Sequence, residues 1–191
     1  METFCESGFS GVALQKLVDE LHPEFECEGH ACSPFSPGPI DDAEQLIFVL
    51  VNPTHYDKER AVVVPLAFQE VTNRDLSLLR VNYSSIDDIQ ATIDDLVARG
   101  MDRIPPQLRK VEHGCSASAA AIRAVQNDNR RMFGVFDTAL EDKRGHASVF
   151  TYTEVIETKR LRAKARAELH RILSPSITTI EDLKCSVSAA V

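Results

Sequence analysis

Cys115 and His146 have the side chains of a nucleophile and its base. Cys115 follows Gly114 and precedes an alanine-rich segment, 116–125, whose composition predicts a helix. The dipole and free amides at a helix N-terminus lower the pKa of a thiol and favour the reactive thiolate. His146 opens a predicted strand, and a nucleophilic cysteine needs such an imidazole as its base. We therefore expect a catalytic pair here, with Glu154 or Glu157 as the group that orients the imidazole.

A Gly-Cys pair at a helix start, followed by a histidine that opens a strand, is similar to the papain-like and transglutaminase-like fold. The resemblance covers residues 114–152. It implies a cysteine-dependent hydrolase or acyl-transfer enzyme, in which an acid or amide follows the histidine. The alternative is that Cys115 is a small buried residue and His146 a structural histidine at a strand edge.

A second group of candidate residues lies in a loop near the N-terminus. Cys27, His30 and Cys32 fall within six positions and have side chains that bind zinc. Their spacing lacks the Cys-x2-Cys pattern or the second ligand pair of common zinc sites. The alternative is a proline-rich surface loop with incidental thiols, and we expect no other cofactor.

Polar residues also stand at the ends of predicted strands, where side chains often line a binding site. They are Asn52, His55, Ser77, Arg80 and Asp137. The alternative is that Asn52-Pro53 forms a turn and Ser77 is an ordinary strand hydroxyl.

Four short motifs run through residues 52–147: Asn-Pro-x-His, Pro-x-Ala-Phe, Leu-Ser and Gly-His-Ala. Together they resemble small bacterial open reading frames of unknown activity. The resemblance implies a bacterial source and no particular chemistry.

The segment 157–173 is expected to form a basic amphipathic helix. Its cations are Lys159, Arg160, Arg162, Lys164, Arg166 and Arg171, and its apolar stripe is Leu161, Ala165, Leu169 and Ile172. Such a helix binds a partner, or docks its stripe on its own domain with the charges solvated. The stripe lacks the large aromatic anchors typical of membrane binding.

The remaining pattern predicts one α+β domain over residues 1–191, with a small mixed or antiparallel sheet flanked by helices. Predicted strands are 46–51, 61–68, 76–81 and 107–111, and a hairpin joins 132–137 to 146–152. Predicted helices are 10–21 and a segment from Ser85 to Gly100, where Ser85 and Asp88 suit a capping box. Residues 22–42 form a proline-rich arm, and residues 174–191 a tail with little structure.

Composition narrows the classes of partner and compartment. A net charge of −8 disfavours nucleic acid unless a local basic patch overrides it. No apolar run approaches the roughly 20 residues of a membrane span, and no signal peptide is evident. Five cysteines, an odd number, suit a reducing cytosol, so we expect a cytoplasmic protein.

The leading hypothesis is a small interaction or accessory protein that binds another protein through the arm 22–42 and the basic helix 157–173. The rival hypothesis is an enzyme that uses Cys115 and His146, and the third is a nucleic-acid binder that uses the basic helix. The distance between Cys115 and His146 separates the first two.

Overall fold

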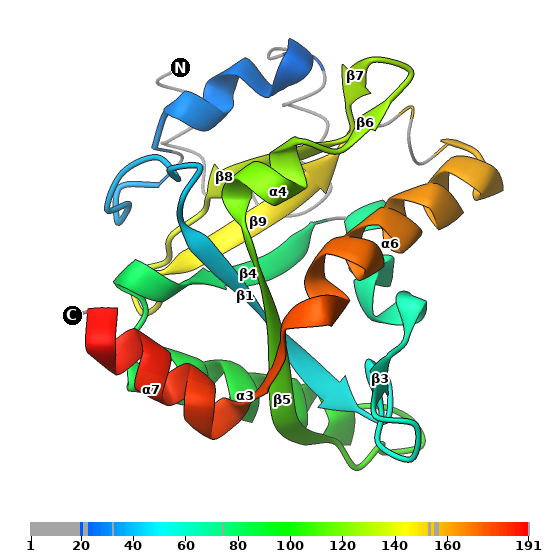
Figure 1. The fold of residues 1–191 in the computed structure, drawn as a ribbon. Coiled ribbons are helices and arrows are strands. Elements are labelled where there is room, and N and C mark those ends of the chain that lie inside the picture. The colour runs from blue at the N-terminus through cyan, green and yellow to red at the C-terminus, as the bar shows by residue number, and fades with distance from the viewer. Residues whose placement is uncertain are drawn as a thin grey trace.

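A six-stranded antiparallel sheet forms the centre of the structure, a computed structural model that describes residues 20, 23–31, 33–73, 75–152, 154 and 157–190 (Figure 1). The strand order is β10-β5-β1-β4-β9-β8. The strands are β1 (Gln45–Asn52), β4 (Leu76–Arg80), β5 (Lys110–Ser118), β8 (Phe133–Asp137), β9 (His146–Thr151) and β10 (Ile177–Thr179). The described residues thus form a single α+β domain, as the sequence predicts.

Helices and short ladders complete the domain. The α-helices are α3 (Ile86–Met101), α4 (Ala119–Arg123), α6 (Lys159–Leu173) and α7 (Ile180–Ala190). The 3-10 helices are η1 (Pro23–Gly29), η2 (Pro65–Thr72), η3 (Val81–Tyr83) and η4 (Ser174–Ser176). Two small ladders pair β2 (Tyr56–Asp57) with β3 (Val62–Val63), and β6 (Gln126–Asn127) with β7 (Arg130–Arg131).

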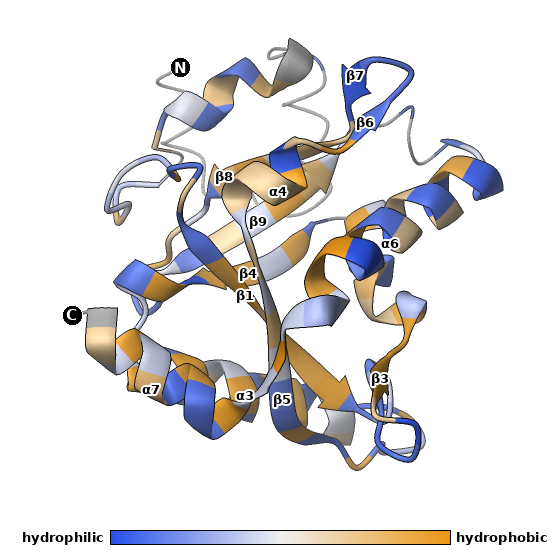
Figure 2. Cartoon of the chain, in the orientation of Figure 1, coloured by the Kyte–Doolittle hydropathy of each residue, from blue (hydrophilic) through white to orange (hydrophobic). Residues whose placement is uncertain are grey.

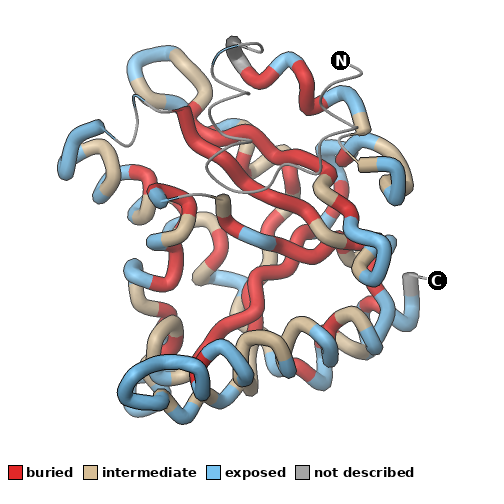
Figure 3. The backbone as a smooth tube through the Cα atoms, turned by 180° about the vertical axis from the view of Figure 1, so that it is seen from behind, coloured by how far each residue is buried: buried red, intermediate tan, exposed pale blue. Residues whose placement is uncertain are grey.

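The two faces of the sheet have different covers, because successive side chains of a strand point to opposite faces. Ile47 and Val49 of β1 pack with apolar residues of α3 and α7, and this is the α3–α7 face. Phe48 and its alternate neighbours on β1 pack in the larger cluster with η2, α4 and α6, and this is the α6 face. Figure 2 shows apolar residues concentrated in the strands, and Figure 3 shows long buried stretches in the middle of the sheet, where β8 is buried throughout and β1 and β9 are buried apart from end residues.

The two best-marked helices confirm their predictions. Ser85 and Asp88 form a capping box at the start of α3: the Ser85 hydroxyl accepts a hydrogen bond from the Asp88 amide at 3.1 Å, and the Asp88 carboxylate accepts from the Ser85 amide at 2.6 Å. The hydroxyl of Thr158 caps α6 in a similar way, by accepting from the Leu161 amide. α6 buries Ala165, Leu169 and Leu173 in the domain.

Three predictions of secondary structure were wrong in whole or in part. In 61–68, only Val62–Val63 is a strand, and Pro65, which lacks an amide donor, begins η2. In 116–125, β5 continues to Ser118, because its register with β1 outweighs alanine's preference for helix, and only Ala119–Arg123 is helical. In 174–191, Ile177–Thr179 pairs with β5, and α7 buries Ile180, Leu183 and Val187 at helical spacing.

The N-terminal predictions have a mixed outcome. The arm 22–42 holds the short helix η1, which buries Phe25 and Cys27 in the core, and the described residues between η1 and β1 contain no further helix or strand. The predicted helix 10–21 lies outside the described residues except for Glu20, which is helical.

A fully buried arginine joins three segments that are distant in sequence. Arg80 of β4 makes two hydrogen bonds to the Glu44 carboxylate, at 2.7 and 2.6 Å. Its guanidinium also lies 3.4 Å from the Asp137 carboxylate of β8 and donates to the Gly38 carbonyl at 2.7 Å. The loop before β1 is thereby tied to β4 and to the hairpin β8–β9.

We expect Arg80→Ala to lower the free energy of unfolding by about 3–5 kcal/mol, because it leaves the Glu44 and Asp137 carboxylates buried without their cation. The matched control is Arg171→Ala, whose ion pair with Glu168 is exposed and should contribute less than about 1 kcal/mol. Urea unfolding measures both variants. Equal losses would contradict the structural role of Arg80.

Candidate functional site

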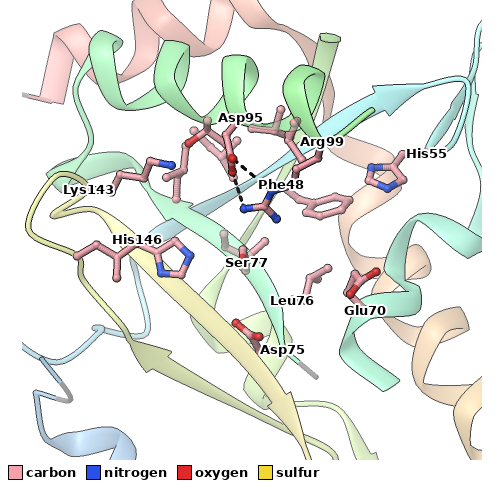
Figure 4. A pocket seen from close by; sticks show the side chains of 17 residues that line it. Phe48, His55, Glu70, Asp75, Leu76, Ser77, Asp95, Arg99, Lys143 and His146 are labelled. Carbon is pink, nitrogen blue, oxygen red and sulfur yellow. Dashed lines mark hydrogen bonds and ion pairs between the residues drawn. The ribbon is translucent and has the colours of Figure 1, made fainter. Parts of the chain in front are cut away.

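The central sheet divides between β1 and β4. Two residue pairs join these strands, Leu46 with Arg80 and Ile47 with Leu79. Beyond Ile47, β1 continues along β5, while β4 continues along β9 as far as Leu76. The two halves of the sheet therefore diverge, and we call this gap the fork; Figure 4 shows β1 and β4 separating around it.

His55 replaces the missing strand neighbour at the far end of β1. Its Nδ1 accepts a hydrogen bond from the Val51 amide at 3.2 Å, and its own amide donates to the Val51 carbonyl. Its ring stacks on Phe48, with ring centroids 5.4 Å apart. Phe48 in turn packs on the buried Phe68 of η2, at 5.3 Å between centroids.

The direction of the main-chain groups in the fork follows from the hydrogen bonds at its ends. The Arg80 amide donates to Gly145 on the β9 side, so the peptide groups of Leu79 and Ser77 point toward β1. The Val51 peptide groups point toward His55, so those of Val49 have the same direction. Val49 and Ser77 thus face one another across the fork, and they are not ladder partners.

A cavity of about 180 Å³ lies in the fork beneath α3. Its walls are mainly apolar, and polar side chains enter from several elements. The polar residues are His55, Glu70, Asp75, Ser77, Thr92, Asp95, Arg99, Lys143 and His146. A mainly apolar pocket with a few converging polar groups is the usual form of a small-molecule site.

The imidazole of His146 has a defined tautomer. Its Nδ1 lies 3.1 Å from the Thr138 carbonyl oxygen, which can only accept, and this contact favours the tautomer with the proton on Nδ1. Nε2 is therefore left with a lone pair. Burial lowers the pKa of His146, which keeps the ring neutral near pH 7.

A row of hydroxyls holds His146 in place. Thr138 Oγ1 lies 2.9 Å from His146 Nδ1 and 2.9 Å from Ser148 Oγ. Ser148 Oγ donates to the Asp75 carboxylate at 2.7 Å. The row links β9, the residue after β8 and the residue before β4, so the ring position depends on all three.

Ser77 is solvent-exposed although it lies in the middle of a central strand. Ser77 pairs with Ser148, and Leu79 pairs with His146. Ser77 and His146 are therefore diagonal neighbours on the α3–α7 face, within reach of a long side chain. Figure 4 shows both side chains in the cavity, with His146 and Lys143 on one side and His55 and Glu70 at the other end.

Both cations of the cavity wall come from outside the sheet. Lys143 belongs to the loop between β8 and β9, and Arg99 belongs to α3. Arg99 pairs with Asp95 one helical turn earlier, at 2.6 Å, and both side chains are partly exposed. The cavity can therefore offer an anionic ligand an ammonium and a guanidinium.

The predicted catalytic group does not come together. Cys115 shares the α6 face with its partner Phe48, whereas His146 shares the α3–α7 face with Leu79, and β1 and β4 separate their strands. Burial raises the pKa of the Cys115 thiol to about 12, so it is a protonated core residue. Glu154 is exposed and pairs with Arg130, and Glu157 is exposed near the start of α6. The sequence prediction failed because Cys115 lies in a strand and not at a helix N-terminus.

The predicted zinc ligands are only partly described. Cys27 is buried, and burial raises its thiol pKa to about 12, whereas zinc binds the thiolate. His30 is exposed, and Cys32 lies outside the described residues. Within the described ranges, no cluster of three or more His, Cys, Asp or Glu side chains could hold a metal.

The polar residues predicted at strand ends fall into two places. His55 and Ser77 line the fork, while Arg80 and Asp137 belong to the buried ion cluster. Asn52 is half-buried at the end of β1. Lys143, Asp95 and Arg99 were missed, because no local pattern brings their segments together.

The predicted binding residues of the last helix differ in exposure. Arg160 is exposed, and Arg162, Arg166 and Leu161 are half-buried. Leu169 is fully buried against its own domain, so its side chain offers no surface to a partner.

No family model, curated protein or solved structure matches this chain. The assignment of a site therefore depends on its geometry. Among the helices that the structure describes, none has the length and apolar character of a membrane span.

His55 should give the fork a pH-dependent stability. Burial, and secondly the Arg109 guanidinium, lower the pKa of His55 from 6.5 to about 4. Because the unfolded chain then takes up the proton first, the free energy of unfolding falls as the pH drops from 6.5 toward 4. The loss should reach about 3 kcal/mol near pH 4.

The matched variant is His55→Asn, whose side-chain oxygen can still accept from the Val51 amide. Urea unfolding at about pH 7 and at about pH 4.5 should show the acid loss in the wild type and a smaller loss in the variant. Asp137, whose pKa burial raises to about 6, stabilises the fold on acidification and acts equally in both chains. If the free energy of unfolding falls equally with pH in the wild type and in His55→Asn, then His55 does not cause the acid loss and the prediction is wrong.

Proposed function

We propose that this protein binds a small organic acid in the fork. The single observation that carries the proposal is the interrupted β1–β4 ladder: Val49 and Ser77 would form the next pair on the same face after Ile47 and Leu79, but they are not ladder partners, and both line the cavity. A strand edge that has lost its neighbour presents main-chain groups that another molecule can bond. A ligand with hydrogen-bonding groups could take the place of the missing strand neighbour in the fork.

The size of the cavity limits the ligand. An apolar cavity of about 150 Å³ accommodates benzene, so a cavity of about 180 Å³ suits a body of one ring or a short chain. Ile47, Leu79 and Leu96 line the apolar part. Larger ligands would have to extend toward solvent past Ser77, which is exposed.

The wall carries three carboxylates, Glu70, Asp75 and Asp95, and two cations, and an acidic group on the ligand fits only beside the cations. Lys143 and the Asp95-paired Arg99 reach the cavity, and both can bond to carboxylate or phosphate oxygens. The Asp75 carboxylate already accepts a hydrogen bond from Ser148. Thus the ligand's acidic end is expected between α3 and the β8–β9 loop, where both cations lie.

Benzoate is a suitable probe of this proposal, because it combines a ring with a carboxylate. Titration should shift the amide resonances of Val49 and Ser77, with a Kd of about 1 mM or tighter. Lys143→Ala should weaken binding about tenfold through loss of a charge-assisted hydrogen bond. Lys184→Ala on α7 is the control and should bind as the wild type does. Shifts that do not saturate, or that avoid the fork, would contradict the proposal.

A second candidate function is binding of an acidic partner protein through α6, which corresponds to the interaction protein expected from the sequence. The observation in its favour is that the apolar side of α6 docks on the domain while Lys159, Arg160 and Lys164 stay exposed. A positive surface on a chain of net charge −8 attracts acidic partners selectively. The arm supports this less, because Phe25 and Cys27 are buried in its own core.

A fluorescent polyglutamate peptide tests the α6 surface by anisotropy. Its binding should weaken as salt shortens the Debye length from about 30 Å at 0.01 M to about 8 Å at 0.15 M. The double variant Arg160→Glu, Arg166→Glu should bind more weakly with an unchanged melting temperature, whereas Arg144→Glu in the β8–β9 loop should bind normally. Equal weakening by Arg144→Glu would indicate a nonspecific charge effect. Stronger binding of a duplex oligonucleotide than of the peptide would favour the nucleic-acid hypothesis instead.

A further inference from the structure

We infer that the fork is the active site of a hydrolase or acyltransferase for esters of small organic acids, with Ser77 as nucleophile and His146 as its general base. The inference rests on the proposed ligand site and adds chemistry to it. The pair differs from the sequence prediction in its nucleophile, a strand serine in place of Cys115.

The register places the two side chains for such a reaction. Ser77 and His146 occupy diagonal positions of adjacent strands on one face, and both line the cavity. The Cβ atoms of diagonal neighbours lie about 7 Å apart or less, and an imidazole and a hydroxymethyl group together can span that distance. Solvent reaches Ser77, so a substrate can reach it as well.

The tautomer of His146 suits the role of base. The Thr138 carbonyl holds the proton on Nδ1, so the unprotonated Nε2 is the atom available to accept the serine proton. Thr138, Ser148 and Asp75 act as positioning residues, because their hydrogen-bonded row fixes the plane of the ring. In serine hydrolases, the group behind the histidine likewise selects the tautomer and orientation.

The open ladder supplies donors for the developing negative charge. The amides of Ser77 and Val49 point into the fork from opposite strands. Two main-chain amides, one of them from the nucleophile itself, form the oxyanion hole in the chymotrypsin arrangement. Lys143 and Arg99 would bind the acidic group of the substrate beside this position.

The reaction balances without a cofactor. Ser77 Oγ attacks the ester carbonyl carbon while its proton moves to His146 Nε2, which gives a tetrahedral oxyanion. The bond from carbon to the alcohol oxygen then breaks, and Nε2 returns the proton to the departing alkoxide. Water repeats both steps on the acyl-Ser77 ester, releasing the acid and restoring the hydroxyl.

An ethyl fluorophosphonate probe tests the nucleophile directly. Attack forms an Oγ–P bond and breaks the P–F bond, and fluoride leaves as His146 takes the serine proton. Peptide mass spectrometry of the full chain should find the adduct on Ser77 in preference to Ser186, an exposed serine of α7 that serves as internal reference. His146→Gln should slow the labelling of Ser77 about 100-fold or more.

The pH profile of the wild type provides a measurement that does not depend on the folding of a variant. Because burial lowers the pKa of His146, Ser77 labelling should stay at its plateau down to pH values below 6.5 and fall only in stronger acid. Thr138→Val, which removes a hydroxyl but keeps the carbonyl, should alter this profile more than it alters benzoate binding. Thr138→Ser should restore it.

Labelling of Ser77 no faster than that of Ser186, or unchanged labelling in a folded His146→Gln protein, would overturn the inference. Benzoate titration of Ser77→Ala separates this failure from failure of the ligand site. If benzoate binds at the fork but Ser77 is not reactive, the proposed ligand site stands and the catalytic inference is wrong. If benzoate does not bind and Ser77 is not reactive, both proposals are wrong.

Discussion

The buried ion cluster around Arg80 is the interaction on which the arrangement of the sheet depends. Arg80 pairs with Leu46 in the short ladder that still joins the two half-sheets. Its guanidinium bonds to Glu44, immediately before β1, and contacts Asp137 at the end of β8. A buried cation without its carboxylates would be strongly unfavourable, so the three segments are held at one point. From that point β1 and β4 can diverge without separating the halves of the domain.

The fork costs the fold the hydrogen bonds and packing that a continuous β1–β4 ladder would provide, and neighbouring groups replace part of them. At Val51, His55 supplies the hydrogen bonds that a continuing β4 would have made. At Phe48, the stacked rings of His55 and Phe68 replace the packing of a strand neighbour. At Val49, the backbone also bonds to His55, and Val49 and Ser77 are not ladder partners of one another. The end of the β1–β4 ladder and an exposed mid-strand serine thus coincide at the same place, and a ligand that bound there would stabilise the folded state.

Local patterns predicted much of the fold, because several segments carry strong and consistent signals. The capping box at Ser85 and Asp88 and the charged helix after Thr158 are examples in which local and tertiary preferences agree. The alanine-rich segment after Cys115 is the opposite case, since alternate burial of Cys115 and Ala117 in a central strand outweighed helix propensity. The error moved Cys115 from a supposed helix N-terminus into the core.

The candidate site was only half predictable for a related reason. His55 and Ser77 follow turn and strand patterns that can be recognised locally, and His146 opens a clear strand. Their convergence depends on the strand order, which places β4 between β1 and β9, and on the early end of the β1–β4 ladder. Neither property is encoded in a short window of sequence, because each results from competition between strands far apart in the chain.

Both histidines that line the fork have neutral imidazole rings near pH 7. Burial lowers the pKa of both His55 and His146, so near pH 7 each ring has one donor and one acceptor nitrogen. The positive charge of the cavity wall then comes from Lys143 and Arg99 and not from the histidines. An acidic ligand would therefore place its charge beside these cations and its uncharged polar atoms among Val49, Ser77 and His146. That separation of charge from hydrogen bonding suits a monoester of a small diacid, whose free carboxylate is charged and whose ester group is not.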